Sequence, residues 1–184
     1  MPRIRGAWDN KTGNWKNGLL FGTWNLKIVA LQEIRWDDTG TLDIQETTIL
    51  YGKCNERRQF GTGFAIHKSL VPNIRDFKDI NPRTSLLTMK AQFFNITFIN
   101  VHAPSKDKSQ EEKDDFYESL DLILNALPQY RIKIVLGDLN AKVGRETVFR
   151  PIIGSHSLHE VTNDNGLRLI DFACGNGLVV NVPS

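Results

Sequence analysis

The 184 residues suffice for one domain with a sizeable hydrophobic core. Hydrophobic residues make up 40% of the chain and charged residues 24%, which are globular values and exclude wholesale disorder. The net charge of +2 is too small to indicate a nucleic-acid partner by itself. No apolar run approaches the ~20 residues of a membrane span, and the first residues lack the apolar segment of a signal peptide. We therefore expect an intracellular protein of the nucleus or cytoplasm, without a membrane partner.

Residues 1–18 are predicted to form a loose basic arm, because they hold four basic residues against one acidic residue and few apolar side chains. The arm is interpreted as a solvated tail, with a contact for a polyanion as the alternative. Residues 19–184 are expected to form one domain. The two cysteines, Cys54 and Cys174, have no CxxC spacing and are expected to be ordinary reduced thiols.

Short segments rich in β-branched and aromatic residues follow the arm, and Gly, Asn, Asp and Pro separate them. This pattern predicts strands. The predicted strands before the first helix are 19–24, 28–34, 44–51, 60–67, 84–90 and 93–101. Two later strands are predicted over 131–137 and 178–182.

Helical spacing appears only in the second half of the chain. Ser109 and Glu112 have the spacing of a capping box, and apolar residues then recur at helical intervals until Pro128. A second helix is predicted over 164–174, ending near Gly175. Many strands followed by few helices predict an α+β sandwich of two mostly antiparallel sheets.

Polar side chains stand where several predicted strands end. Glu33, His102 and Asp138 follow apolar segments, as do the amides Asn25 and Asn140. Carboxylates can hold a hard divalent cation, and a carboxylate or a histidine can activate water. Together these residue types suit phosphodiester hydrolysis.

An ordered series of motifs makes this interpretation specific. "GTWN", "ALQEIRW", "GTGFAIHK", "NVHAPS", "VLGDLNAKVG" and "NDNGLRLIDFA" resemble the endonuclease/exonuclease/phosphatase superfamily, the relatives of DNase I. The resemblance is to the endonuclease domains of non-LTR retrotransposons and to craniofacial development protein 2-like proteins. It implies a DNase I-like sandwich flanked by helices and an ancestral Mg²⁺-dependent cleavage of DNA, with Mn²⁺ as a substitute cofactor. It implies no particular protein partner.

The resemblance also assigns roles to the polar residues. Glu33 corresponds to the metal-binding glutamate, Asp138 to the aspartate that positions or activates water, and Asn140 to the asparagine that stabilises the transition state. Asn25 resembles an asparagine that orients the metal-binding carboxylate. His102 stands where the superfamily contacts the substrate phosphate.

Arg83, in "NPRTSL", is a weaker match to an arginine near the nucleic-acid surface. His156 and His159 lack the spacing of a zinc motif and are interpreted as loop histidines.

Two departures from the family pattern lead us to expect impaired or absent activity. The first crossover helix is missing, since only Leu26 to Val29 separate "TWN" from "ALQE". We therefore expect Asn25 to be displaced from the site. The chain also stops at Ser184, before the strands and the closing Ser-Asp-His motif that the resemblance implies.

Three interpretations of function remain open at this point. The first is an incomplete, retrotransposon-derived endonuclease domain. The second is a phosphatase of the same superfamily, which a substrate panel would distinguish. The third is a nucleic-acid-binding protein without catalysis, which a binding assay in a salt series would distinguish.

Overall fold

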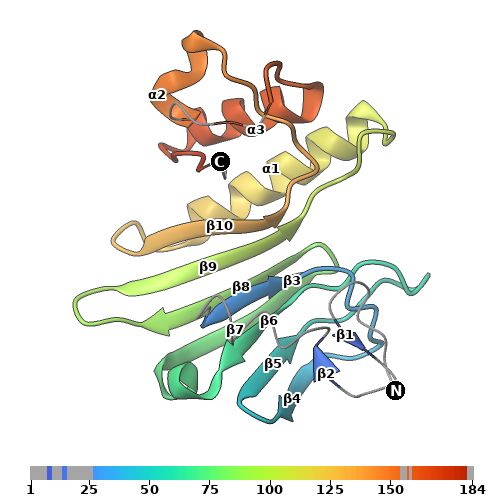
Figure 1. Ribbon diagram of the computed structural model, residues 1–184, viewed down its shortest axis with the longest axis vertical. Helices are drawn as coiled ribbons and strands as arrows, with labels where there is room; N and C mark the ends of the chain where they lie inside the picture. Colours follow the sequence, from blue (N-terminus) through green and yellow to red (C-terminus); the bar gives the residue numbers. More distant parts are fainter. Residues whose placement is uncertain (1–7, 10–13, 16–26, 154–156, 158, 182–184) are drawn as a thin grey trace. The chain divides into compact units, whose positions relative to one another are not determined.

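The computed structural model describes residues 8–9, 14–15, 27–153, 157 and 159–181. The chain divides into two compact units, which are described separately (Figure 1). Unit 1 comprises Met1–His102 and Tyr130–Asp138, and unit 2 comprises Ala103–Gln129 and Leu139–Ser184.

The first sheet of unit 1 is antiparallel throughout and has the strand order β3-β6-β5-β4. The polar pair Gln45–Glu46 turns the chain from the edge strand β4 to its neighbour β5, with Gln45 in a left-handed conformation (φ 48°). The strands are β3 (Ile28–Leu31), β4 (Gly40–Ile44), β5 (Thr47–Tyr51) and β6 (Gly63–His67).

The second sheet of unit 1 is mixed and has the order β10-β9-β8-β7. Strand β8 pairs antiparallel with both β7 and β9, whereas β10 pairs with β9 in parallel. The 3₁₀-helix η2 (Lys68–Asn73) connects the two sheets. The strands are β7 (Ile74–Asn81), β8 (Thr84–Lys90), β9 (Asn95–His102) and β10 (Ile132–Asp138).

A hydrophobic core lies between these two sheets. Leu50, Phe64 and Ile66 of the first sheet pack with Leu87 and Met89 of the second. The alternation of side chains along each strand directs these residues to one face. Unit 1 is therefore a β-sandwich.

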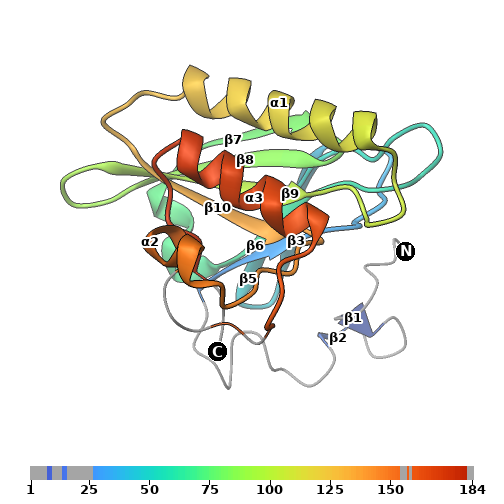
Figure 2. The same ribbon diagram turned by 90° about the horizontal axis from the view of Figure 1, so that it is seen from above.

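Unit 2 is built from helices and loops. Ser109 caps α1 (Gln110–Ala126) by accepting from Glu112 N, and Asn163 caps α3 (Asp164–Gly175) by accepting from Gly166 N. The two helices lie side by side, with the ring of Tyr117 5.6 Å from that of Phe172 (Figure 2). The short helices η3 (Thr147–Phe149) and α2 (Arg150–Ile153) complete the unit.

The predicted α+β sandwich is confirmed, but three element predictions need correction. The predicted strand 44–51 is the end of β4, a turn and β5. The predicted strand 178–182 is not formed over the described residues 178–181. Strand β7 was missed because two bulges shift its register, so its apolar residues do not alternate.

Other predictions lie mostly outside the described residues. The predicted strand 19–24 and Asn25 are among them. Within the predicted basic arm the structure describes only the short strands β1 (Trp8–Asp9) and β2 (Asn14–Trp15), which pair antiparallel.

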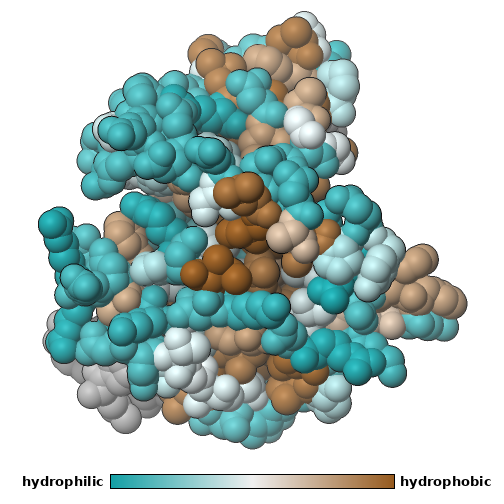
Figure 3. All heavy atoms as spheres, turned by 180° about the vertical axis from the view of Figure 1, so that it is seen from behind, coloured by the Kyte–Doolittle hydropathy of each residue, from teal (hydrophilic) through white to brown (hydrophobic). Residues whose placement is uncertain are grey.

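The surface is mixed in character. Figure 3 shows apolar side chains exposed among polar ones, and the exposed apolar residues include Ile132 and Ile134 of β10. In the described part of the chain, no helix combines the length and apolar character needed to cross a membrane.

Candidate functional site

The candidate site of unit 1 begins where the parallel strands β9 and β10 end. His102 is the last residue of β9, Asp138 is the last residue of β10, and the two are register partners. Gly137 permits this close pairing, because a Cβ at its position would lie 2.0 Å from the Val101 carbonyl oxygen. Its φ of +133° is also unfavourable for any other residue. Parallel pairing thus places the imidazole of His102 and the carboxylate of Asp138 at the same end of the two strands.

Glu33 lies two residues beyond the end of β3 and is paired with a cation. The Arg35 guanidinium donates from Nη2 to Glu33 Oε2 over 2.8 Å. Both residues have left-handed backbones, with φ values of 56° and 59°. The backbone N–H groups of Ile34 and Arg35 donate to the carbonyl groups of Gly61 and Phe60, which holds this conformation.

Arg83, in the turn between β7 and β8, is fastened to His102. Its Nη1 donates to the His102 carbonyl oxygen over 2.9 Å, and His102 N donates to the Arg83 carbonyl oxygen. The Arg83 guanidinium lies 3.8 Å from the centre of the Phe60 ring, a cation–π contact. The Phe60 ring in turn meets the His102 ring edge-on at 5.8 Å.

His102 is buried, and its surroundings hold it in the neutral form. Burial is the main cause that lowers the pKa of His102, and the positive charge of Arg83 lowers it further. The negative charges of Asp138 and Glu33 act in the opposite direction, and Arg35 lowers the pKa again. His102 therefore lies within the electrostatic reach of all four charged groups. We call these five residues the strand-end cluster: Glu33, Arg35, Arg83, His102 and Asp138.

A buried amide joins the two sheets beside this cluster. Asn100, fully buried on β9, donates from Nδ2 to the Leu31 and Gly63 carbonyl oxygens of the first sheet. Its Oδ1 accepts from Gln32, the residue before Glu33. Asn100 thereby fixes the chain that leads to Glu33.

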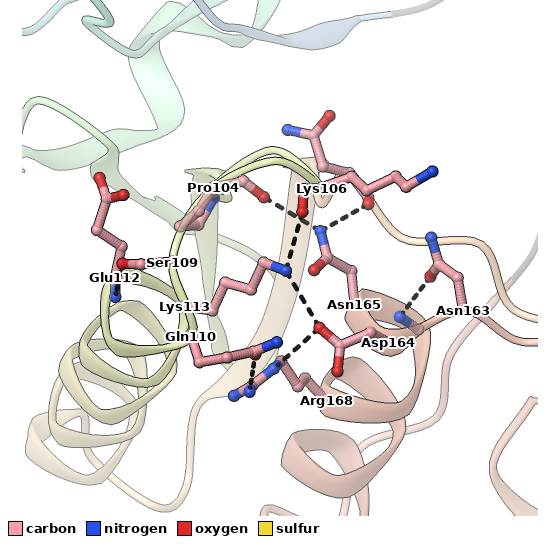
Figure 4. Close-up of polar contacts among 12 residues, drawn as sticks. Pro104, Lys106, Ser109, Gln110, Glu112, Lys113, Asn163, Asp164, Asn165 and Arg168 are labelled. Carbon is pink, nitrogen blue, oxygen red and sulfur yellow. Dashed lines mark hydrogen bonds and ion pairs between the residues drawn. The ribbon is translucent and has the colours of Figure 1, made fainter.

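In unit 2, the loop with Asn140 is held by asparagines. Asn140 donates from Nδ2 to the Ala103 carbonyl oxygen over 2.9 Å and has a left-handed backbone (φ 48°). The nearly fully buried Asn165 donates from Nδ2 to the carbonyl oxygens of Asn140 and Pro104 (Figure 4). The first turn of α3 thus fastens two loops of unit 2.

The buried side chain of Lys113 links the loop that contains Lys106 to the helices of unit 2. Lys113 Nζ, on α1, donates to the Lys106 carbonyl oxygen and to Asp164 Oδ2, both over 3.1 Å (Figure 4). Asp164 also pairs with Arg168, which binds Asp114 of α1. The hydrogen bond from Lys113 is the main reason that the pKa of Asp164 is lowered.

The predicted site residues have different outcomes. The structure brings Glu33, His102, Asp138 and the weakly matched Arg83 into one cluster, while their chemical roles stay predictions. Asn140 lies in unit 2, and Asn25 and His156 lie outside the described residues. His159 donates its backbone N–H to Ser157, consistent with a loop histidine.

Sequence reasoning missed Arg35, Phe60 and Asn100. Arg35 stands inside the motif "ALQEIRW", so its spacing of two from Glu33 was an available signal. The contacts of Phe60 and Asn100 join residues far apart in the chain, and no local pattern indicates them.

The donor chemistry of the cluster fits one kind of metal site. Carboxylate oxygens suit a hard cation such as Mg²⁺, which is often held by one or two carboxylates and several waters. Glu33 and Asp138 could supply those carboxylates. Among the described residues, no three His, Cys, Asp or Glu side chains gather to hold an ion. The donors thus fit a largely hydrated cation rather than a closed protein cage.

The chain is similar in sequence to two known proteins that share one name. No protein-family model matches the chain. It is 31% identical over 156 residues to craniofacial development protein 2 of Tragulus javanicus and 30% identical to that of Bos taurus. Each alignment covers 85% of this chain, but the chain spans only about a quarter of the relatives' length, 27% and 26%.

Similar solved structures define the fold. The endonuclease domain of TRAS1, a telomere-specific non-LTR retrotransposon, aligns with a TM-score of 0.55 over 86% of this chain and 64% of its own. The AP endonuclease LMAP from Leishmania major aligns with a TM-score of 0.58 over 87% and 61%. Both are 12% identical, so these likenesses concern the fold alone.

The fold comparison and the sequence comparison agree on the class of protein that the chain resembles. The chain has a DNase I-like fold, as its resemblance to the endonuclease/exonuclease/phosphatase superfamily predicts. In sequence it is similar to craniofacial development protein 2, at 31% and 30% identity.

Proposed function

We propose that the strand-end cluster is the centre of a divalent-metal-dependent phosphodiesterase that acts on DNA, with low turnover in this chain. The observation that carries the proposal is the register pairing of His102 with Asp138, with Glu33 in electrostatic reach of the same imidazole. This arrangement supports phosphodiester chemistry because it combines metal-binding carboxylates with a neutral imidazole and two guanidinium groups.

Each side chain has a role that its chemistry allows. Glu33 would hold Mg²⁺ or Mn²⁺, which would neutralise charge on the phosphate oxygens when bound. The Asp138 carboxylate would orient a water molecule and accept its proton. Neutral His102 would donate a hydrogen bond to a phosphate oxygen.

Two internal features support low turnover. The Glu33 carboxylate is already paired with Arg35. His102 Nδ1 is buried and has no hydrogen-bond partner among the described residues, so no hydrogen bond at that nitrogen helps to fix the tautomer. Loss of acid–base assistance typically costs ~10²–10⁴ in rate.

The metal site is tested by thermal unfolding in a Mn²⁺ titration. Cation binding to the folded state should raise the melting temperature by roughly 2–5 °C at tenfold excess over a millimolar Kd. Glu33→Gln should abolish this rise, whereas Asp76→Asn, on an exposed carboxylate of β7, should retain it. An unchanged melting curve for the unsubstituted chain would refute the metal site.

Turnover is tested by nicking of supercoiled plasmid in Mg²⁺. We expect the chain to nick no faster than its Asp138→Ala variant. Robust nicking that depends on Asp138 would refute the proposed low turnover and would identify His102 as the residue to substitute next.

The ion pair between Glu33 and Arg35 favours a second candidate function, DNA binding without catalysis, because a neutralised carboxylate has less need of a cation. DNA binding that persists fully in EDTA, with no effect of Mn²⁺ on stability, would support this candidate instead.

A further inference from the structure

Arg35 is the least satisfied cation of the strand-end cluster. Its Nη2 binds Glu33, but its Nε is buried and has no hydrogen-bond partner among the described residues. A guanidinium has five N–H donors in a rigid planar fork, suited to two acceptor oxygens of one carboxylate or phosphate. A buried donor without an acceptor is costly, and it calls for an explanation such as a missing ligand.

The backbone around Arg35 holds the side chain in place at an energetic cost. The left-handed conformation is unfavourable for a non-glycine residue, and both Glu33 and Arg35 adopt it. Ile34 and Trp36 are buried on either side of Arg35 and anchor the segment in the core of the first sheet. Strain of this kind often accompanies functional sites.

The two arginines of the cluster differ in how firmly they are held. Arg83 stacks on Phe60 and exchanges hydrogen bonds with the backbone of His102. The side chains of Arg35 and Glu33 are 35% and 39% exposed, and an ion pair of that exposure contributes little to stability. A divalent cation can therefore displace Arg35 from Glu33 at little cost.

We propose that Arg35 exchanges partners: it neutralises Glu33 while no metal is bound, and it binds the phosphodiester of the substrate once a divalent cation has taken Glu33. The proposal rests on the proposed function, because it requires Glu33 to be a metal ligand. Displaced from Glu33, the guanidinium offers its planar fork to an anion, and a phosphodiester has the oxygens that match it. No covalent step is involved.

The first test is calorimetric titration of the metal-free chain with Mn²⁺. Arg35→Gln removes the competing cation, so its Kd for Mn²⁺ should fall about two- to fivefold. Arg35→Lys keeps the charge and should bind Mn²⁺ like the unsubstituted chain, and circular dichroism confirms that each variant is folded. Arg58→Gln is the matched control, because Arg58 also has a left-handed backbone (φ 52°) and pairs with Asp37 over 2.8 Å. It should leave the Kd unchanged.

Any other result of this titration overturns the exchange. An equal or higher Kd for Arg35→Gln would mean that Arg35 does not compete with the metal. Absence of Mn²⁺ binding in all variants would refute both the exchange and the metal site. A third outcome would refute only the exchange of partners by Arg35 and would leave the metal site standing. In that outcome Mn²⁺ stabilises the unsubstituted chain through Glu33, but Arg35→Gln binds Mn²⁺ no more tightly than the unsubstituted chain.

The second test measures the binding of a fluorescently labelled DNA duplex by anisotropy, in EDTA and in saturating Mn²⁺. Arg35→Gln should bind like the unsubstituted chain in EDTA, where Arg35 is held by Glu33. In Mn²⁺ it should bind about tenfold more weakly, because a charge-assisted contact to phosphate is missing. An equal loss in both conditions, or no loss in Mn²⁺, would overturn the phosphate contact.

Discussion

At the scale of single residues, Tyr117 on α1 predicts a pH effect. Its hydroxyl is buried without a hydrogen-bond partner in the described part of the chain, and burial raises the pKa of Tyr117 from 10.0 to about 12, with Arg168 opposing. The unfolded chain therefore releases this proton first, so the tyrosine contributes stability that is complete below pH 10 and is lost as the pH rises through 12.

Tyr117→Phe should remove this alkaline loss. Between pH 8 and pH 11 the unfolding free energy of the unsubstituted chain should fall by about 1 kcal/mol more than that of the variant. Urea unfolding at both pH values measures the difference. At pH 8 the variant should be at least as stable, because it no longer buries an unpaired hydroxyl. Equal losses in both proteins would contradict the assignment.

At the scale of secondary-structure elements, the end of β10 depends on Gly137. Gly137→Ala would force a methyl group against the Val101 carbonyl oxygen of β9. We expect a loss of more than about 2 kcal/mol in unfolding free energy, measured by urea unfolding, because backbone rather than a flexible side chain must move.

Gly175→Ala, at the end of α3, is the control for this substitution. A Cβ at that position meets nothing within 4 Å. Because alanine favours helix over glycine, stability should be unchanged or slightly raised. Hydrogen exchange in Gly137→Ala should rise first at the last residues of β9 and β10. A variant with unchanged exchange there would show that the strand ends tolerate the methyl group.

At the scale of the whole molecule, DNA binding should be electrostatic. The net charge is only +2, so affinity must come from local contacts of individual basic side chains such as Arg35 and Arg83. Contacts to phosphate release counterions, and the logarithm of the affinity should fall linearly with the logarithm of the salt concentration. A gel-shift series from 50 to 200 mM salt, roughly the range over which such binding weakens, measures the slope. Binding that does not respond to salt would contradict phosphate recognition.

The sequence alone predicted the helices and strands that are defined by interactions between residues close together in the chain. Ser109 caps α1 with the hydrogen bond that its spacing from Glu112 predicts, and α3 forms where the sequence predicts a helix. Strands β8 and β10 follow from short runs of β-branched and apolar residues. The sequence also selected Glu33, His102 and Asp138 as candidates, because each polar residue follows an apolar run, and their functional roles stay predictions.

Tertiary contacts decided the rest, because they join residues that no short pattern relates. The bulged edge strand β7 is defined only by its pairing with β8. Asn100 satisfies two carbonyl groups of the opposite sheet, 69 and 37 positions away along the chain. The ion pair between Arg35 and Glu33 depends on the left-handed backbones of both residues. Backbone hydrogen bonds to Phe60 and Gly61 hold this conformation in place. Local periodicity carries no information about such long-range hydrogen bonds, whereas the folded sandwich fixes them through burial and register.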